Sequence, residues 1–239
     1  MPDLTLLWIF CLGTVLMRSA GCVINDYADK DFDRHVERTK DRPMATGQVT
    51  AREALSLAAG LVLAAGLLIL PLAKLVWAMA ALALFLAASY PFTKRFFAIP
   101  QAYLGIAFSI GIPMAFAAQT NSLPPLIWIL MLANLFWVIA YDTAYAIVDK
   151  PDDLKIGIKT SAITMGRFDV MGVMLCHGMF IVIMLAIGQL QAMGMAYYAG
   201  LMIAVGLIIY QYTLIRNRDR TLCFKAFLHN NWVGMVVFA

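Results

Sequence analysis

Charged residues are scarce in this sequence. They make up 13% of its 239 residues, about half of the roughly 25% found in an ordinary soluble domain. Hydrophobic residues make up 62% of the chain. A soluble globular fold is therefore excluded, and the composition indicates a membrane protein.

Residues that form disulfides and zinc sites are also few. The chain has four cysteines without any CxxC or other paired spacing, and three histidines without an HxxxH-type ligand spacing. We therefore expect packing thiols and ordinary packing or interfacial imidazoles, and neither a disulfide framework nor a zinc site.

The sequence also lacks the alternating apolar pattern of membrane strands. Its apolar runs are continuous and of membrane-spanning length, which favours helices because a helix satisfies its own backbone polar groups in lipid. The first run shows no basic n-region and no small-residue cleavage site, so we expect a retained span. The runs cover about 4–23, 54–73, 75–92, 99–118, 123–148, 170–190 and 193–215, and an eighth, too short to span, begins near Phe227. This pattern predicts an all-α, polytopic transmembrane bundle.

A dense acidic stretch, residues 25–33, directly follows the first apolar run. On a helix, Asp26, Asp29 and Asp33 would lie within about 60° of one another, while Asp31 points elsewhere. Such closely packed carboxylates require cations nearby, which can be divalent metal ions or basic side chains. Taken alone, this stretch fits a solvated charged loop, with Lys30 and Arg34 as partners, better than a metal site.

One basic residue, Arg18, lies inside the first apolar run. A charge in hydrocarbon is costly unless it faces the interior of the bundle. On a continuous helix, Arg18 lies within about 20° of Asn25 and Asp29, so we expect it to face inward on the same stripe. A long polar loop, residues 34–47, follows the acidic stretch. Loops of this length are often functional.

A second group of carboxylates occurs at the end of the fifth run. On a helix, Asp142, Asp149 and Asp153 would fall within about 40° of one face. Pro151 lies between the last two and is expected to disfavour helix at the preceding residue or to bend the stripe.

The basic residues alternate between loops. Sixteen of the 18 lie on every second loop, and the positive-inside rule assigns that side to the cytoplasm. Both acidic groups end on the same predicted side. Two carboxylate stripes among basic loops favour a site for a metal-bridged polyanion that opens toward lipid over a solvated loop.

Magnesium suits such a site, since it prefers oxygen ligands and binds through one or two carboxylates plus phosphate oxygens. A diphosphate held by carboxylates and metal, with apolar helices beside it, points to a lipid diphosphate as substrate. Transfer of an isoprenyl chain is the reaction class that uses both features.

Several motifs carry a resemblance to a known family. The string Asn25-Asp26-x-x-Asp29-x-x-x-Asp33 and the later Asp149-x-x-x-Asp153 resemble the paired aspartate motifs of the UbiA family of intramembrane aromatic prenyltransferases. The flanking segments 17–22, 42–43, 141–146 and 157–160 look like its bacterial 4-hydroxybenzoate polyprenyltransferase branch.

The resemblance implies a nine-helix fold around a central cavity. About eight helices are expected here, in a single prenyltransferase domain over residues 1–239 that lacks the first helix of the family and most of the last. It implies that Mg²⁺ is held with the diphosphate by Asp26, Asp29, Asp33, Asp149 and Asp153. It also implies substrate-binding roles for Asn25, Arg42, Lys94, Arg95 and Lys159.

The implied reaction is magnesium-dependent transfer of a polyprenyl chain to the ring carbon ortho to the hydroxyl of 4-hydroxybenzoate, a membrane step of ubiquinone biosynthesis. We expect Arg18 or Arg95 to pair with the substrate carboxylate, and Asp142 or Tyr145 to orient the phenol. The expected location is the bacterial inner membrane, with no nucleic-acid partner. Two alternatives are open: a relative that uses another acceptor, such as a naphthoate, homogentisate or haem, and a cation or polyanion transporter.

Overall fold

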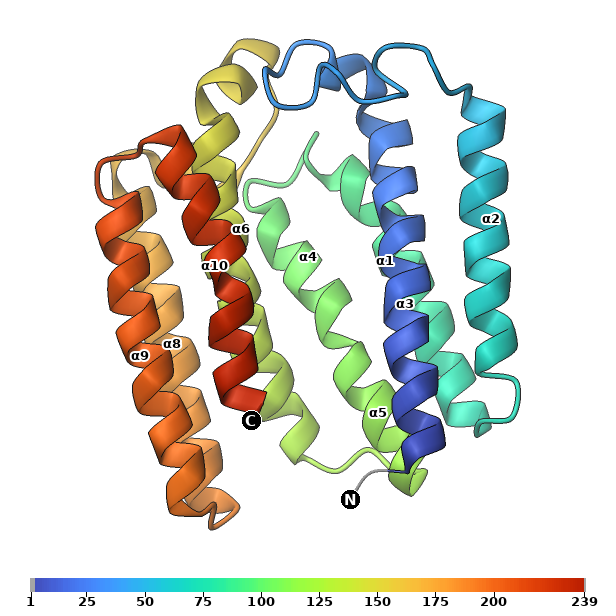
Figure 1. Cartoon of the computed structure of the whole chain (residues 1–239), viewed down its shortest axis with the longest axis vertical. Coiled ribbons are helices and arrows are strands. Elements are labelled where there is room, and N and C mark those ends of the chain that lie inside the picture. Colours follow the sequence, from blue (N-terminus) through green and yellow to red (C-terminus); the bar gives the residue numbers. More distant parts are fainter. Residues whose placement is uncertain (1–2, 239) are drawn as a thin grey trace. The chain divides into compact units, whose positions relative to one another are not determined.

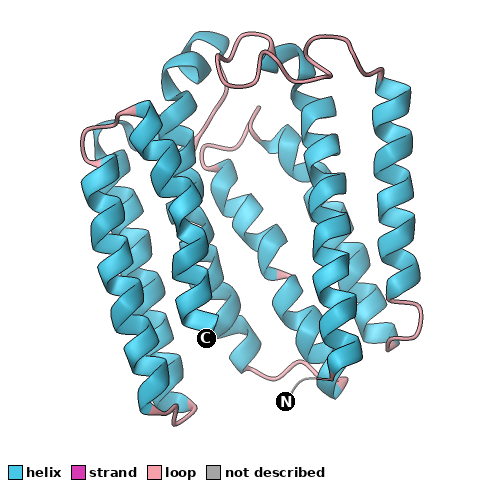
Figure 2. Ribbon diagram, in the orientation of Figure 1, coloured by secondary structure: helices cyan, strands magenta, loops and turns pink. Residues whose placement is uncertain are grey.

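The structure is a computed structural model that describes residues 3–238, and all regular elements in this part of the chain are helices (Figure 2). The elements are α1 (Leu4–Asp33), α2 (Ala51–Leu68), α3 (Lys74–Thr93), α4 (Pro100–Ser109), α5 (Gly111–Thr120), α6 (Leu126–Ile156), α7 (Ser161–Met165), the 3₁₀ helix η1 (Gly166–Phe168), α8 (Asp169–Leu190), α9 (Met195–Ile215) and α10 (Arg220–Phe238). The predicted all-α fold class is confirmed. Within residues 3–238, seven helical segments are long and apolar enough to span a bilayer.

Side-chain caps begin several helices where the sequence places polar residues before an apolar run. The carboxylate of Asp3 accepts the backbone N–H of Thr5 at 2.7 Å at the start of α1. Thr50 and Glu53 form a reciprocal capping box at the start of α2, which satisfies backbone donors that lack partners within the helix.

Three helix boundaries differ from the predictions. Helix α1 continues through the whole acidic stretch to Asp33, and α6 continues through Pro151 to Ile156. The expected loss of helix before this proline was therefore wrong. Helix α10 begins at Arg220, seven residues before the predicted start at Phe227. The prediction missed this start because the first turns of the helix are polar and an apolar run does not include them.

The fourth apolar run contains a helix break that its composition only hinted at. Helices α4 and α5 are separated at Ile110. Pro113 has no N–H to donate to the carbonyl of Ser109, so one helical hydrogen bond is missing. The next bond resumes from the N–H of Met114 to the carbonyl of Ile110 at 3.2 Å.

The chain divides into two compact units. The first holds α1, α2, α3 and α5. In it, α1 and α2 run antiparallel and lie side by side (Figure 1), and α3 packs against α1 and α5. Small buried residues on α1 and α2, such as Ala20, Ala54 and Ala58, allow close packing of these helices.

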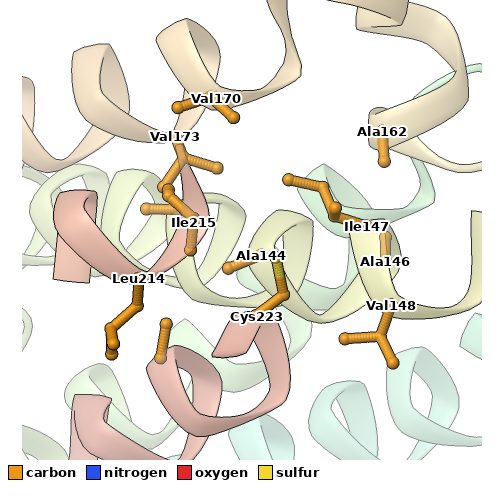
Figure 3. Close-up of a cluster of buried hydrophobic side chains, with 12 residues drawn as sticks. Ala144, Ala146, Ile147, Val148, Ala162, Val170, Val173, Leu214, Ile215 and Cys223 are labelled. Atoms are coloured by element: carbon orange, nitrogen blue, oxygen red, sulfur yellow. The ribbon is translucent and has the colours of Figure 1, made fainter. Parts of the chain in front are cut away.

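The second unit holds α4 and α6 to α10 with η1. Its buried apolar cluster brings together side chains from α6, α7, α8, α9 and α10 (Figure 3). Helices α9 and α10 approach closely at Gly200, where an added Cβ would lie 2.5 Å from the carbonyl oxygen of Val236. The cluster surrounds the C-terminal half of α6, and so holds the part of α6 that carries the second group of carboxylates.

All four cysteines are free thiols, of which Cys223 is buried, Cys176 is half-buried, and Cys11 and Cys22 are exposed.

Candidate active site

The first group of carboxylates lies on the last turns of α1. Asp29 and Asp33 are each 7% exposed, Asp26 is half-buried, and Asp31 is exposed. The helical spacing predicts this difference in exposure between Asp31 and the other three carboxylates. The stripe formed by Asp26, Asp29 and Asp33, here called the α1 carboxylates, therefore faces protein.

Arg42 supplies a cation to this stripe within the same unit. Its Nη1 donates to Oδ1 of Asp26 at 2.7 Å and to Oδ2 of Asp33 at 3.0 Å. The side chain of Arg42 is 26% exposed. The sequence suggested Arg42 as a counter-charge for diphosphate, but its pairing with these two carboxylates was not foreseen.

The loop of residues 34–50 places this arginine by folding back over the end of α1. The hydroxyl of Thr39 donates to the carbonyl of Asp33 at 3.2 Å, and Nε of Arg34 donates to the carbonyl of Ala45 at 3.0 Å. These bonds bring Arg42 next to Asp33 and Asp26, which lie 9 and 16 positions earlier in the chain. Local periodicity cannot reveal such a pairing.

The second group of carboxylates lies on α6, in the second unit. Asp142 and Asp153 are buried, and Asp149 is half-buried. Because α6 stays helical through Pro151, the predicted stripe extends over the full span from 142 to 153. Tyr145 lies between these positions and packs on Phe227 of α10, with ring centroids 4.5 Å apart.

A backbone connection brings two of the predicted basic residues together in this unit. The N–H of Lys159 donates to the carbonyl of Lys94 at 3.0 Å, and Nζ of Lys159 donates to the carbonyl of Phe96 at 3.2 Å. The hydroxyl of Thr164 donates to the carbonyl of Ala98. The loop after α3 is thus fastened to the segment after α6.

The same segment begins directly at the end of α6. The N–H of Ile158 donates to the carbonyl of Asp153 at 3.2 Å. Gly157 has φ +75°, a conformation that glycine adopts without a steric penalty. This turn places the segment that contains Lys159 beside the last carboxylate of α6.

The remaining predicted residues differ in exposure. Arg18 on α1 and Arg95 after α3 are exposed, and Asn25 is half-buried. Arg18 lies on the same helix as the α1 carboxylates, and its expected inward orientation stays a prediction.

Asp169 and Asp152 were missed by the sequence analysis. Both are buried and ion-paired. The signal for Asp169 in the sequence was that few carboxylates border the apolar runs.

The carboxylates of the site have the oxygen donors that magnesium prefers. Among the described residues, no group of three or more His, Cys, Asp or Glu side chains is arranged as a complete metal site. The α1 carboxylates nevertheless offer hard oxygen donors on one face, and magnesium typically takes one or two carboxylates, with waters and substrate phosphates as its other ligands. The residues therefore fit a metal ion that arrives with a phosphate substrate better than an all-protein cage.

These features define an all-helical, multi-pass membrane protein with carboxylates at two helix ends and cationic side chains grouped near them. The chain belongs to the UbiA prenyltransferase family, whose family model matches residues 1–233.

Curated relatives match along the whole chain. The sequence is 70% identical to the 4-hydroxybenzoate octaprenyltransferase of Nitrosospira multiformis, over 100% of this chain and 82% of the relative. It is 65% identical to the protein of the same name from Nitrosomonas europaea, with the same two coverages.

Solved structures share the fold at low identity. An apo UbiA homologue from Aeropyrum pernix K1 superposes with a TM-score of 0.87 at 23% identity, covering 100% of this chain and 89% of that one. A UbiA homologue from Archaeoglobus fulgidus, bound to GPP and Mg²⁺, gives a TM-score of 0.73 at 16% identity over 99% and 89%.

Proposed function

We propose that the chain transfers a polyprenyl group from polyprenyl diphosphate to the ring carbon ortho to the hydroxyl of 4-hydroxybenzoate, a membrane step of ubiquinone biosynthesis. The observation that carries this proposal is the 70% identity, over the whole chain, to a relative named 4-hydroxybenzoate octaprenyltransferase. At this identity, a shared acceptor accounts for the similarity better than a naphthoate, homogentisate or haem acceptor does.

The carboxylates of both units are assigned to the magnesium-diphosphate. The proposed ligands are Asp26, Asp29, Asp33, Asp149 and Asp153, with Asn25 as an oxygen donor beside them. When bound, Mg²⁺ neutralises the charge that develops on the departing diphosphate. The burial of Asp29, Asp33 and Asp153 supports this role, because the attraction between a carboxylate and a metal ion is stronger where solvent is excluded.

Four basic residues are assigned to the diphosphate itself: Arg42, Lys94, Arg95 and Lys159. The backbone bond between Lys94 and Lys159 supports a shared role for these two. Arg42 already contacts Asp26 and Asp33, so binding of a metal-diphosphate would give it phosphate oxygens as new partners in place of carboxylate oxygens.

The reaction breaks the allylic C–O bond, and the electron pair leaves with diphosphate. The ring carbon ortho to the hydroxyl then forms the new C–C bond and loses its proton. We assign Arg18 or Arg95 to the acceptor carboxylate, and Asp142 or Tyr145 to orientation of the phenol. Unchanged affinity for 4-hydroxybenzoate in both Arg18→Ala and Arg95→Ala variants would count against the first assignment.

The proposed location is the bacterial inner membrane, with the carboxylate-bearing helix ends at the cytoplasmic side. It follows from the concentration of basic residues on alternate loops. The lipid substrate would reach the site from the bilayer, and 4-hydroxybenzoate from the cytoplasm.

The test is a transfer assay on membranes that contain the chain. Membranes are incubated with polyprenyl diphosphate and radiolabelled 4-hydroxybenzoate, with and without Mg²⁺. A magnesium-dependent, lipid-extractable radiolabelled product is expected. If label stays in the aqueous phase but a naphthoate or homogentisate acceptor is prenylated, the acceptor assignment is wrong. If no acceptor is prenylated, the enzyme assignment fails and a transport function gains support.

A further inference from the structure

The first residue of α8, Asp169, is fully buried and makes four polar contacts. Its Oδ2 accepts from Nζ of Lys150 at 2.7 Å. Its Oδ1 accepts from Nη2 of Arg218 at 2.7 Å, from Nε of the same arginine at 2.9 Å and from the N–H of Val170 at 2.7 Å. One carboxylate thus joins α6, the start of α8 and the loop between α9 and α10.

The two cations also fasten the corner before α8. Nζ of Lys150 donates to the carbonyl of Gly166 at 2.7 Å, and Nη2 of Arg218 donates to the carbonyl of Arg167 at 2.8 Å. The hydrogen bond to Asp169 raises the pKa of Arg218 above its usual value.

A second buried carboxylate anchors the same part of α6. Asp152 accepts from Nη2 of Arg220, the first residue of α10, at 3.0 Å and from Nζ of Lys155 at 3.3 Å. Lys150 and Asp152 are the two neighbours of Pro151. Both residues that flank the proline are therefore tied to other helices of the second unit.

These anchors are placed where α6 is weakest. Pro151 cannot donate a hydrogen bond to the carbonyl of Ile147, which removes one bond from the helix at this point. Lys150 is about 100° around the helix from Asp149, and Asp152 is about 100° from Asp153. The anchored side chains, Lys150 and Asp152, thus point in other directions than the proposed ligands Asp149 and Asp153. Their ion pairs fix the rotation of the end of α6 about its axis.

Stability alone does not require this arrangement. Burying charges costs desolvation energy, and replacing a buried ionic cluster by apolar side chains of similar volume is often neutral or stabilising. Here the buried ion pairs involve Lys150 and Asp152, the two residues that flank Pro151. Each lies next to a carboxylate that is assigned to the metal-diphosphate.

We propose that Asp169 and Asp152 are positioning residues, which set the rotation of the α6 end so that Asp149 and Asp153 can bind the magnesium-diphosphate. This inference rests on the proposed function for the identity of the ligand. In this role, both residues act through α6 and not by contact with the substrate. Groups that orient metal ligands typically change metal affinity by about 10- to 100-fold when they are removed.

The principal test compares Asp169→Asn with the matched control Asp219→Asn in the full chain. Asp219 is an exposed carboxylate that caps the first turn of α10 by accepting from the N–H of Leu222, and asparagine caps a helix equally well. Binding of inorganic pyrophosphate with Mg²⁺ is measured by calorimetry, and KM values are measured for both substrates.

We expect Asp169→Asn to weaken magnesium-pyrophosphate binding and to raise the KM for polyprenyl diphosphate, each by about tenfold. The KM for 4-hydroxybenzoate stays unchanged, and Asp219→Asn behaves as the wild type. A lower unfolding temperature with unchanged pyrophosphate binding would show a purely structural role and overturn the proposal.

A second variant keeps the test decisive if Asp169→Asn does not fold. Arg220→Gln removes a partly exposed partner of Asp152 and leaves Lys155 in place, so we expect about threefold weaker pyrophosphate binding. Arg216→Gln, which removes an exposed cation from the preceding loop, is its control. Equal binding in these two variants would refute the role of Asp152. Pyrophosphate binding is measured without turnover. If the wild type binds pyrophosphate but forms no product, the proposed function is wrong while the positioning role is retained.

Discussion

Replacing Arg42 by methionine tests whether this arginine occupies the carboxylate oxygens that a magnesium ion would use. In the structure, its Nη1 contacts Asp26 and Asp33 at 2.7 and 3.0 Å. Methionine keeps much of the apolar stem and removes the charge. The variant therefore leaves the α1 carboxylates with mutual repulsion and without their arginine.

The size of the effect follows from the two contacts. A hydrogen bond to a charged group contributes about 1.5–3 kcal/mol, but partly exposed ion pairs are reduced by solvent. The side chains of Arg42 and Asp26 are 26% and 29% exposed, and that of Asp33 is 9% exposed. We therefore expect a loss of about 2 kcal/mol for both contacts together. For a chain of this length, that lowers the unfolding temperature by about 4–8 °C.

The informative measurement is the response to Mg²⁺ added without diphosphate. In the wild type, a magnesium ion must displace Arg42, whereas in Arg42→Met the oxygens are accessible and need a cation. Purified protein in detergent is unfolded thermally over a series of Mg²⁺ concentrations. We expect Mg²⁺ to stabilise the variant at concentrations about 30-fold lower than the wild type, which corresponds to about 2 kcal/mol.

Lys40→Met is the matched control. Lys40 lies in the same loop, but its salt bridge goes to the exposed carboxylate of Glu37 at 2.7 Å. This variant should keep the Mg²⁺ response of the wild type. Identical Mg²⁺ responses in Arg42→Met and the wild type would refute the reasoning that arginine and metal compete for the same carboxylates.

Three further predictions concern the site and the packing. Asp29→Asn should lower prenyl transfer at least 100-fold and Asp31→Asn less than twofold in the membrane assay, because Asp29 is buried on the stripe whereas Asp31 is exposed and lies off it. The reverse order would contradict the helical-face argument. Gly200→Ala should lower the free energy of unfolding by about 1–3 kcal/mol, since its Cβ would meet the carbonyl oxygen of Val236. Gly206→Ala, in the same helix, is the control because its Cβ would meet no atom within 4 Å; equal unfolding temperatures of the two variants would show that α9 and α10 can separate freely. Chelation of divalent ions should abolish product formation and added Mg²⁺ should restore it; full activity in chelator would exclude a metal-bound diphosphate.

Much of the fold could be predicted because membrane helices have a simple physical signature. Every backbone polar group must be satisfied within lipid, so each continuous apolar run of sufficient length is a helix. The failures came where this rule does not apply. The polar first turns of α10 and the helical path of α6 through Pro151 depend on contacts such as Asp152 with Arg220, which no apolar pattern records.

The candidate site was predicted in part. Spacing on a helix places Asp29 and Asp33 on one face and Asp31 on another, because residues four apart differ by only about 40°. The motifs also indicated the family, and the family model confirms it. The roles of the single site residues, the single-domain organisation and the position of the site at the cytoplasmic side stay predictions.

The sequence by itself determined the helices, the faces that carry the carboxylates and the family, since each depends on local periodicity or on short motifs. Only the tertiary structure decided which cation meets which carboxylate. Arg42 reaches Asp26 and Asp33 through a loop, and Arg218 reaches Asp169 across 49 positions. Such pairings depend on how chain segments fold back on one another, and charge interactions at a few ångströms are set by that geometry and not by distance along the chain.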